Sequence, residues 1–180
     1  EDPSASTYAA RRGAAYGLAG VVKGAGIPAL KAHGVMAALA AATGDRKACA
    51  EAREGALMAY ECLAGALGRL FEPYIVGALP QLLACAADGS GAVRAATAAA
   101  ASAIMARLSA QGVRMVLPNL LKALAETQWR TKQSACELLG AMAHCAPRVL
   151  AGALTQAVPA LQKVLADPHA KVRAAAEAAL

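Results

Sequence analysis

Three segments of this chain align without gaps on one pattern of proline, carboxylate and cation. They run from residue 80 to 94, from 118 to 132 and from 159 to 173, and each begins with proline. A carboxylate and then a cation follow at the same two places in each segment: Asp88 and Arg94, Glu126 and Lys132, Asp167 and Arg173. The cation recurs earlier at Arg53 and Arg11, so the five cations follow one another at a nearly even spacing. A period of about 40 residues is typical of helical-repeat arrays.

Composition favours helices throughout the array. Alanine, the strongest helix former, occupies 52 of the 180 positions, while aromatic residues make up 3%. Valine and leucine recur at spacings of three and four in 116–124 and 158–165, which indicates one apolar helical face in each segment. We therefore predict an all-α fold, a HEAT-repeat α-solenoid: a right-handed superhelix of antiparallel helix pairs with about four and a half repeats.

The register divides the whole chain, 1–180, into a single array. Residues 8–24 are expected to form the second helix of a preceding repeat. Four pairs follow, at about 28–68, 73–109, 113–146 and 149–180, with helices at 28–42 and 50–68, 73–87 and 91–109, 113–126 and 129–146, and 149–166 and 170–180. The chain starts without Met and has no polar terminal repeat, which favours a fragment of a longer solenoid.

Each element of the pattern has a physical interpretation. The proline should kink the first helix because it removes a backbone donor. The carboxylate lies in the short turn, where it can cap the second helix. A carboxylate and a cation can also bridge stacked repeats, so we expect an internal ladder built from Arg11, Arg53, Asp88, Arg94, Glu126, Lys132, Asp167 and Arg173. The alternative is that these residues are exposed binding groups.

No catalytic or metal-binding constellation is recognisable. His33, His144 and His169 are isolated, and His144-Cys145 falls short of the three or four ligands that a zinc site needs. The five cysteines have no paired spacing and are expected to be reduced core residues. The chain also lacks a phosphate-binding glycine loop. We therefore expect no enzyme activity, no cofactor, no metal and no small-molecule substrate.

A membrane segment is not expected either. The longest apolar run, 95–106, lies between Arg94 and Arg107 and is too short to cross a bilayer.

The cations outside the ladder are the candidates for partner contacts. The formal net charge is +6, and clustered cations would attract RNA phosphates. A merely solvated surface is an equally good interpretation. Trp129, beside Arg130, can be a partner anchor or a core residue. The candidates for partner or RNA contact are Arg46, Lys47, Arg114, Lys122, Trp129, Arg130, Arg148, Lys163 and Lys171.

Several stretches carry a more specific resemblance. Residues 8–35, 54–83, 129–150 and 165–180 resemble the central HEAT region of the large ribosome-associated translational activator of the general amino-acid control pathway. Residues 71–83 and 129–147 are also similar to the HEAT domain of fungal translation elongation factor 3. The resemblance implies a cytoplasmic solenoid that lies on ribosomes, binds an ABC-F-type ATPase and helps activate the kinase of initiation factor 2 alpha. It offers no catalytic residues to carry over.

Two functional hypotheses follow from these features. The first is a non-catalytic scaffold segment that binds the ribosome and protein partners in translational control under amino-acid starvation. The alternative is a HEAT adaptor for peptides or proteins, such as a transport receptor or phosphatase scaffold. The net positive charge disfavours the adaptor, because its groove would be acidic or apolar.

Overall fold

The computed structural model describes residues 3–45, 47, 49–145 and 147–180, and within them the chain is helical without strands. The all-α prediction is therefore confirmed. The helices are α1 (Pro3–Ala25), α2 (Pro28–Ala32), α3 (Val35–Gly44), α4 (Ala50–Leu67), the 3-10 turn η1 (Gly68–Phe71), α5 (Glu72–Cys85), α6 (Gly91–Met105), α7 (Ala110–Ala123), α8 (Trp129–Cys145), α9 (Pro147–Ala151), α10 (Leu154–Val164) and α11 (Ala170–Ala179).

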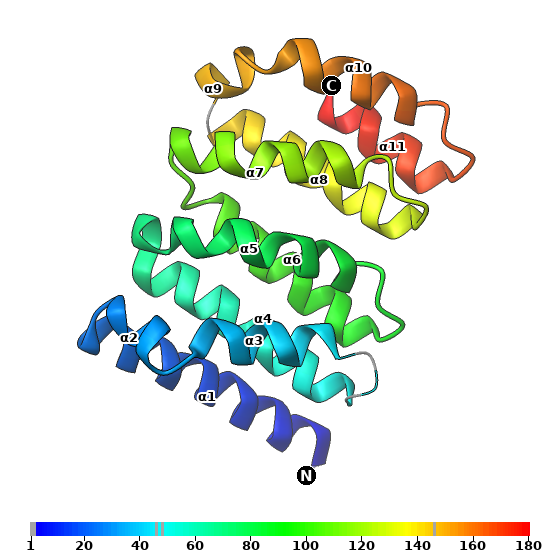
Figure 1. Cartoon of the computed structure of the whole chain (residues 1–180). Coiled ribbons are helices and arrows are strands. Elements are labelled where there is room, and N and C mark those ends of the chain that lie inside the picture. Colours follow the sequence, from blue (N-terminus) through cyan, green and yellow to red (C-terminus); the bar gives the residue numbers. More distant parts are fainter. Residues whose placement is uncertain (1–2, 46, 48, 146) are drawn as a thin grey trace.

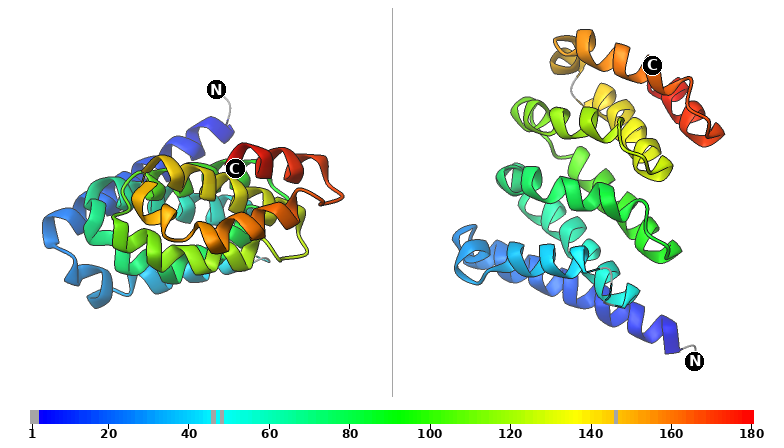
Figure 2. Two further views of the ribbon diagram at one scale, coloured as in Figure 1. Left: turned by 90° about the horizontal axis from the view of Figure 1, so that it is seen from above. Right: turned by 45° about the vertical axis from the view of Figure 1, so that its right-hand side comes forward.

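The helices stack as antiparallel pairs into two parallel layers. Figure 1 shows α3, α5, α7 and α10 along one face, with α1, α4, α6, α8 and α11 behind them. Each second helix packs on the next one along the chain, as α1 does on α4 and α8 on α11. The two ends of the chain lie at opposite ends of the stack (Figure 2). This arrangement is the predicted HEAT-type solenoid.

One continuous apolar core runs between the two layers. Large side chains such as Leu57, Ile104 and Leu120 are fully buried in it. Alanine takes the places where second helices approach one another, and Ala100 and Ala176 are completely inaccessible. Because a methyl group keeps neighbouring helices close, the high alanine content serves the stacking as well as helix propensity.

Two of the first helices differ from the expected single segments. The helix expected at 28–42 is divided into α2 and α3, because Gly34 adopts a left-handed backbone with φ of 59°. The helix expected at 149–166 is divided into α9 and α10 around Gly152. Helical repeats with three helices are common in this class of fold. α5, α7 and α10 continue through the internal Pro80, Pro118 and Pro159.

The stretch Ala50–Cys85 is long and apolar enough, by length and composition alone, to cross a membrane, and an 18-residue window within it has a mean hydropathy of 1.2. It is not one straight helix, however. Gly68, with φ of 56°, ends α4, and α5 runs back antiparallel to it (Figure 1). The stretch therefore forms the two packed helices of one repeat.

Candidate functional site

The turns at Asp45, Asp88 and Asp167, each between paired helices, share one local structure built on aspartate. The Oδ1 atom of Asp88 accepts a hydrogen bond from the backbone N–H of Ser90 at 2.9 Å, and Asp167 accepts one from His169 at 2.9 Å. Asp45 does the same with Lys47 at 2.8 Å. Such aspartate turns mimic a backbone turn and fix the start of the following helix.

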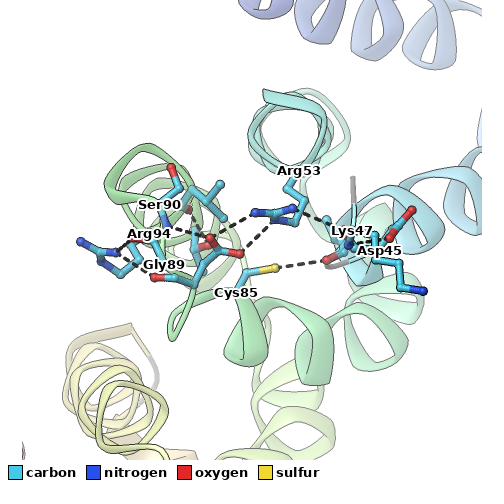
Figure 3. Close-up of polar contacts among 11 residues, drawn as sticks. Asp45, Lys47, Arg53, Cys85, Gly89, Ser90 and Arg94 are labelled. Atoms are coloured by element: carbon cyan, nitrogen blue, oxygen red, sulfur yellow. Dashed lines mark hydrogen bonds and ion pairs between the residues drawn. The ribbon is translucent and has the colours of Figure 1, made fainter. Parts of the chain in front are cut away.

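The second carboxylate oxygen of the turn faces the preceding repeat. Arg53 donates from Nε to Oδ2 of Asp88 at 2.9 Å and from Nη2 to Oδ1 at 3.3 Å. Lys132 donates from Nζ to Oδ2 of Asp167 at 2.6 Å. Both pairs span 35 residues, so the cation of one repeat binds the carboxylate of the next. Figure 3 shows Arg53 between the turn that carries Gly89 and Ser90 and the turn that carries Asp45, and its Nη1 donates to the carbonyl of Asp45 at 3.3 Å.

These ion pairs are largely buried, and in the second of them hydrogen bonding alters the titration of the carboxylate. The side chains of Arg53 and Asp88 are only 9% and 3% exposed. The hydrogen bond from Lys132, aided by the backbone N–H of His169, lowers the pKa of Asp167 below its usual value. Both interactions favour the charged form of the carboxyl group.

Within its own repeat, the cation binds backbone rather than the carboxylate. Arg94 donates from Nη1 to the carbonyls of Asp88 and Gly89, each at 2.8 Å. Arg173 donates in the same way to the carbonyls of Asp167 and Pro168. The guanidinium therefore satisfies carbonyls of the turn that precedes its helix.

The ladder is interrupted between the second and third complete repeats. Glu126 is exposed, and within the described residues it forms no ion pair with Arg94. Two differences explain this. The step from Arg94 to Lys132 is shorter than the other steps between cations. Glu126 therefore follows Arg94 more closely along the chain than Asp88 follows Arg53. Glutamate also lacks the short side chain that closes an aspartate turn.

The first cation of the expected ladder also has a different partner. Arg11 donates to Glu54 of α4 at 2.7 Å, which places its ion pair on the helix and not in the turn. The neighbouring Arg12 binds Glu61 with both ends of its guanidinium. Thus two adjacent arginines of α1 tie it to two residues of α4 that lie about two helical turns apart.

A basic hollow opens where the ladder is interrupted. It has a volume of about 300 Å³ and lies between α6, α8 and the start of α11. Its lining includes Arg94, Trp129, Arg130, Gln133, Glu137 and Lys171. We call this set the basic hollow.

Trp129 organises one wall of the basic hollow. Its ring stacks on the His169 imidazole, with centroids 3.7 Å apart and planes 9° apart. The Arg130 guanidinium lies 4.6 Å from the centre of the indole, and the Lys171 ammonium lies 5.9 Å from it. Cations prefer to sit over an aromatic ring of this kind. Trp129 is half-buried, which is a position between the two alternatives that the sequence leaves open.

The other candidate contact residues do not join this cluster. Lys122 borders a separate groove between α5 and α7, and Lys163 borders one between α7 and α10. Lys47, Arg114 and Arg148 are exposed at scattered positions, and Arg46 lies outside the described residues. Of the candidates, Trp129, Arg130 and Lys171 are brought together, and they are joined by Arg94, which the sequence pattern assigns to the ladder.

Sequence reasoning missed two participants. His169 has no partner that the sequence pattern reveals, yet it stacks on Trp129, which belongs to the preceding repeat. The repeat period could have revealed this contact, because residues one period apart lie in adjacent repeats. Asp45 is the second residue that was missed. The first turn is longer than the others, and this concealed the equivalence of Asp45 to Asp88 and Asp167.

The described residues also define what the chain offers chemically. No group of three or more His, Cys, Asp or Glu residues in that part of the chain could hold a metal ion. Cys49 is an exposed thiol, while Cys62, Cys85 and Cys136 are buried, and the Cys85 thiol donates to the carbonyl of Thr43. Burial raises the pKa of the Cys136 thiol to about 11, so this group stays protonated and unreactive at neutral pH.

The fold and its surfaces define a helical-repeat scaffold of the HEAT class. Residues 11–180 match the EF3 N-terminal HEAT repeat family, and the chain belongs to that family. It is 55% identical over 96% of its length to the human protein named stalled ribosome sensor GCN1. It is 52% identical over 98% of its length to the Dictyostelium discoideum eIF-2-alpha kinase activator GCN1.

The chain spans 6% of the human relative and 7% of the Dictyostelium relative. Among solved structures, the MAST/Orbit N-terminal domain superposes with a TM-score of 0.58 over 78% of this chain and 71% of that one. At 16% identity this likeness shows the fold alone. Both the expected HEAT class and the resemblance stated from the sequence are confirmed.

Proposed function

We propose that this chain is a scaffold segment of a ribosome-associated regulator of translation. The observation that carries the proposal is the 55% identity, over 96% of the chain, to a protein named as a stalled ribosome sensor. Identity of that extent covers the surface as well as the core, so a shared binding role is expected together with the shared fold. The match to the EF3 N-terminal HEAT repeat family supports the same ribosome-associated role.

The finer parts of the proposal follow from the names of the relatives. The Dictyostelium relative is named as an activator of the eIF-2-alpha kinase, so we place this segment in that pathway. The family resemblance adds a role under amino-acid starvation. The segment acts there without catalysis, in the cytoplasm, and positions its parent protein on the ribosome. An ABC-F-type ATPase is a further proposed partner, which rests on the family resemblance alone.

Co-sedimentation with purified ribosomes over a salt series tests the proposal. We expect the chain to pellet with ribosomes at low salt and to be released as salt rises, because basic surfaces bind phosphates by counterion release. A variant with Lys122, Lys163 and Arg114 changed to Gln tests whether the first-helix face contributes. If the chain stays in the supernatant even at low salt, direct ribosome binding by this segment is wrong, and the peptide-adaptor alternative takes its place.

A further inference from the structure

The step from α6 to α8 differs from the other steps of the solenoid. α6 packs more extensively against α4 than against α8, and among the described residues the ladder ion pair is absent at this step. The basic hollow lies between these two helices. Its cations come from the first turns of three successive second helices: Arg94 of α6, Arg130 of α8 and Lys171 of α11.

The charge in the basic hollow is only partly compensated. Among its described lining residues, Glu137 is the one carboxylate, and Oε1 of Glu137 already accepts a hydrogen bond from Gln133 at 2.7 Å. Arg130 and Lys171 contact the indole of Trp129 and form no ion pair within the described part of the chain. The helix dipoles of α8 and α11 add positive potential at the same place.

The cations are also held in position before any ligand arrives. Arg94 is fixed through Nη1 to two carbonyls, which leaves Nε and Nη2 available to an incoming acceptor. Trp129 is clamped by His169 on one side and holds Arg130 and Lys171 near its ring. The buried Nδ1 of His169 has no hydrogen-bond partner among the described residues. Groups fixed in this way lose little entropy on binding.

We propose that the basic hollow binds backbone phosphates of an RNA strand, so that this step of the solenoid is its ribosomal RNA contact. The inference rests on the proposed ribosome association. Arginine presents a planar fork of donors that matches phosphate oxygens, and two of the three cations are arginines. The guanidinium plane of Arg130 and the indole beneath it offer stacking surfaces to a base, which an acidic peptide would not use.

The single tryptophan of the chain gives this site its own signal. We would titrate the whole chain with a short single-stranded RNA of mixed sequence, about 12 nucleotides long, within the range of site sizes for such strands. The fluorescence of Trp129 should change on binding, because phosphates would draw Arg130 and Lys171 away from its ring. The change should be largely independent of sequence, since phosphate contacts carry no sequence information.

A paired set of variants separates this site from general basicity. The double variant Arg130→Gln and Lys171→Gln should weaken RNA binding roughly tenfold or more, and lower the salt slope by about 0.7 for each phosphate that is no longer neutralised. The control variant Arg114→Gln and Lys163→Gln removes the same charge from the first-helix face. It should leave the affinity within about twofold of the parent, since neither residue lines the basic hollow.

The outcomes distinguish this site from the proposed function. Equal effects of the two double variants, or an unchanged Trp129 signal at saturating RNA, would overturn the inference. It would also fall if a polyglutamate peptide bound the hollow and RNA did not. Ribosome co-sedimentation that survives Arg130→Gln and Lys171→Gln would refute the RNA site but leave ribosome association standing. Variant-sensitive RNA binding without ribosome co-sedimentation would support the site and refute the proposed function.

Discussion

Arg53 connects two inter-helix turns with one guanidinium, and its removal from water makes that connection strong. Because both Arg53 and Asp88 are buried, loss of one partner leaves the other charge unpaired in a low-dielectric setting. Breaking such a pair typically costs about 3–5 kcal/mol, whereas exposed pairs contribute about 0–1 kcal/mol. We therefore expect only the buried ion pairs of the ladder to contribute substantially to the free energy of unfolding.

Asp88→Asn should lower the free energy of unfolding by about 3 kcal/mol, because the isosteric amide keeps the turn but leaves Arg53 uncompensated. Arg94→Ala should cost less, about 1–2 kcal/mol, because its hydrogen bonds are to carbonyls at a half-buried site. Urea unfolding measures both. Glu126→Gln is the matched control, since this exposed carboxylate forms no ladder pair among the described residues. If Asp88→Asn behaves like Glu126→Gln, the ladder does not stabilise the fold.

Because the pKa of Asp167 is lowered, we expect the contribution of this residue to the stability of the fold to depend on pH. A carboxyl group whose pKa falls on folding contributes stability above its unfolded value of about 3.9, and loses it as pH drops through the folded value. The stability difference between the parent and Asp167→Asn should therefore be constant at neutral pH and shrink below about pH 4. Urea midpoints measured across pH would show this, and a difference that grew on acidification would contradict it.

How far the sequence predicts these residues depends on whether their partners lie in the same repeat. The proline, carboxylate and cation register pairs Asp88 with Arg94 and Asp167 with Arg173. In the structure the two aspartates lie in turns, and the two arginines lie near the starts of α6 and α11. The register could not show that Arg53 binds Asp88, because that choice is made by the stacking of two repeats. Nor did the register show that Glu126 forms no ladder ion pair among the described residues, because a glutamate in a shorter repeat still fits the pattern of proline, carboxylate and cation.

At the scale of the elements, a carboxylate at the start of α5 holds the start of α7. The carboxylate of Glu72 accepts hydrogen bonds from the backbone N–H and the hydroxyl of Ser109, and the hydroxyl in turn accepts one from the N–H of Gly112. A side chain on Gly112 would force its neighbours to shift. A Cβ atom on it would lie 2.8 Å from Cδ2 of Leu108 and 2.9 Å from the carboxyl carbon of Glu72.

Gly112→Ala should consequently destabilise the chain, even though alanine is the better helix former by about 1 kcal/mol. The added methyl group displaces Glu72 from Ser109, so we expect a net loss of about 1–3 kcal/mol. Gly77→Ala in α5 is the control, because nothing lies within 4 Å of its Cβ position. That variant should be neutral or stabilising. Thermal unfolding of both proteins compares them, and two changes of the same sign would argue against the steric reason.

The same scale shows where helix boundaries escape prediction. The repeat register placed second helices at 50–68, 129–146 and 170–180, and α4, α8 and α11 lie within two residues of these bounds. The divisions at Gly34 and Gly152 were missed because glycine is tolerated within a helical pattern. Only packing against the next layer decides whether a glycine bends the chain.

Across the whole molecule, stability should approximate a sum over repeats and the interfaces between them. The α6–α8 interface has no ladder pair among its described residues and encloses the basic hollow, so it is expected to couple its neighbours most weakly. A surface for binding RNA and a weak step in the stack would then coincide. Bound phosphates would bridge Arg94 to Arg130 where the protein supplies no bridge of its own.

Weak coupling at this step can be detected with the single tryptophan, which lies on its C-terminal side. Leu57→Ala, at a fully buried position in α4, should cost about 2–5 kcal/mol. It should lower the urea midpoint followed by circular dichroism more than the midpoint followed by Trp129 fluorescence. Leu139→Ala in α8, at a position 2% exposed, should shift the Trp129 midpoint most. Transitions that coincide in both variants would show one cooperative unit, because two-state unfolding gives the same curve by every probe. The α6–α8 step would then be as strongly coupled as the ion-paired steps, and the interruption of the ladder would have no consequence for folding.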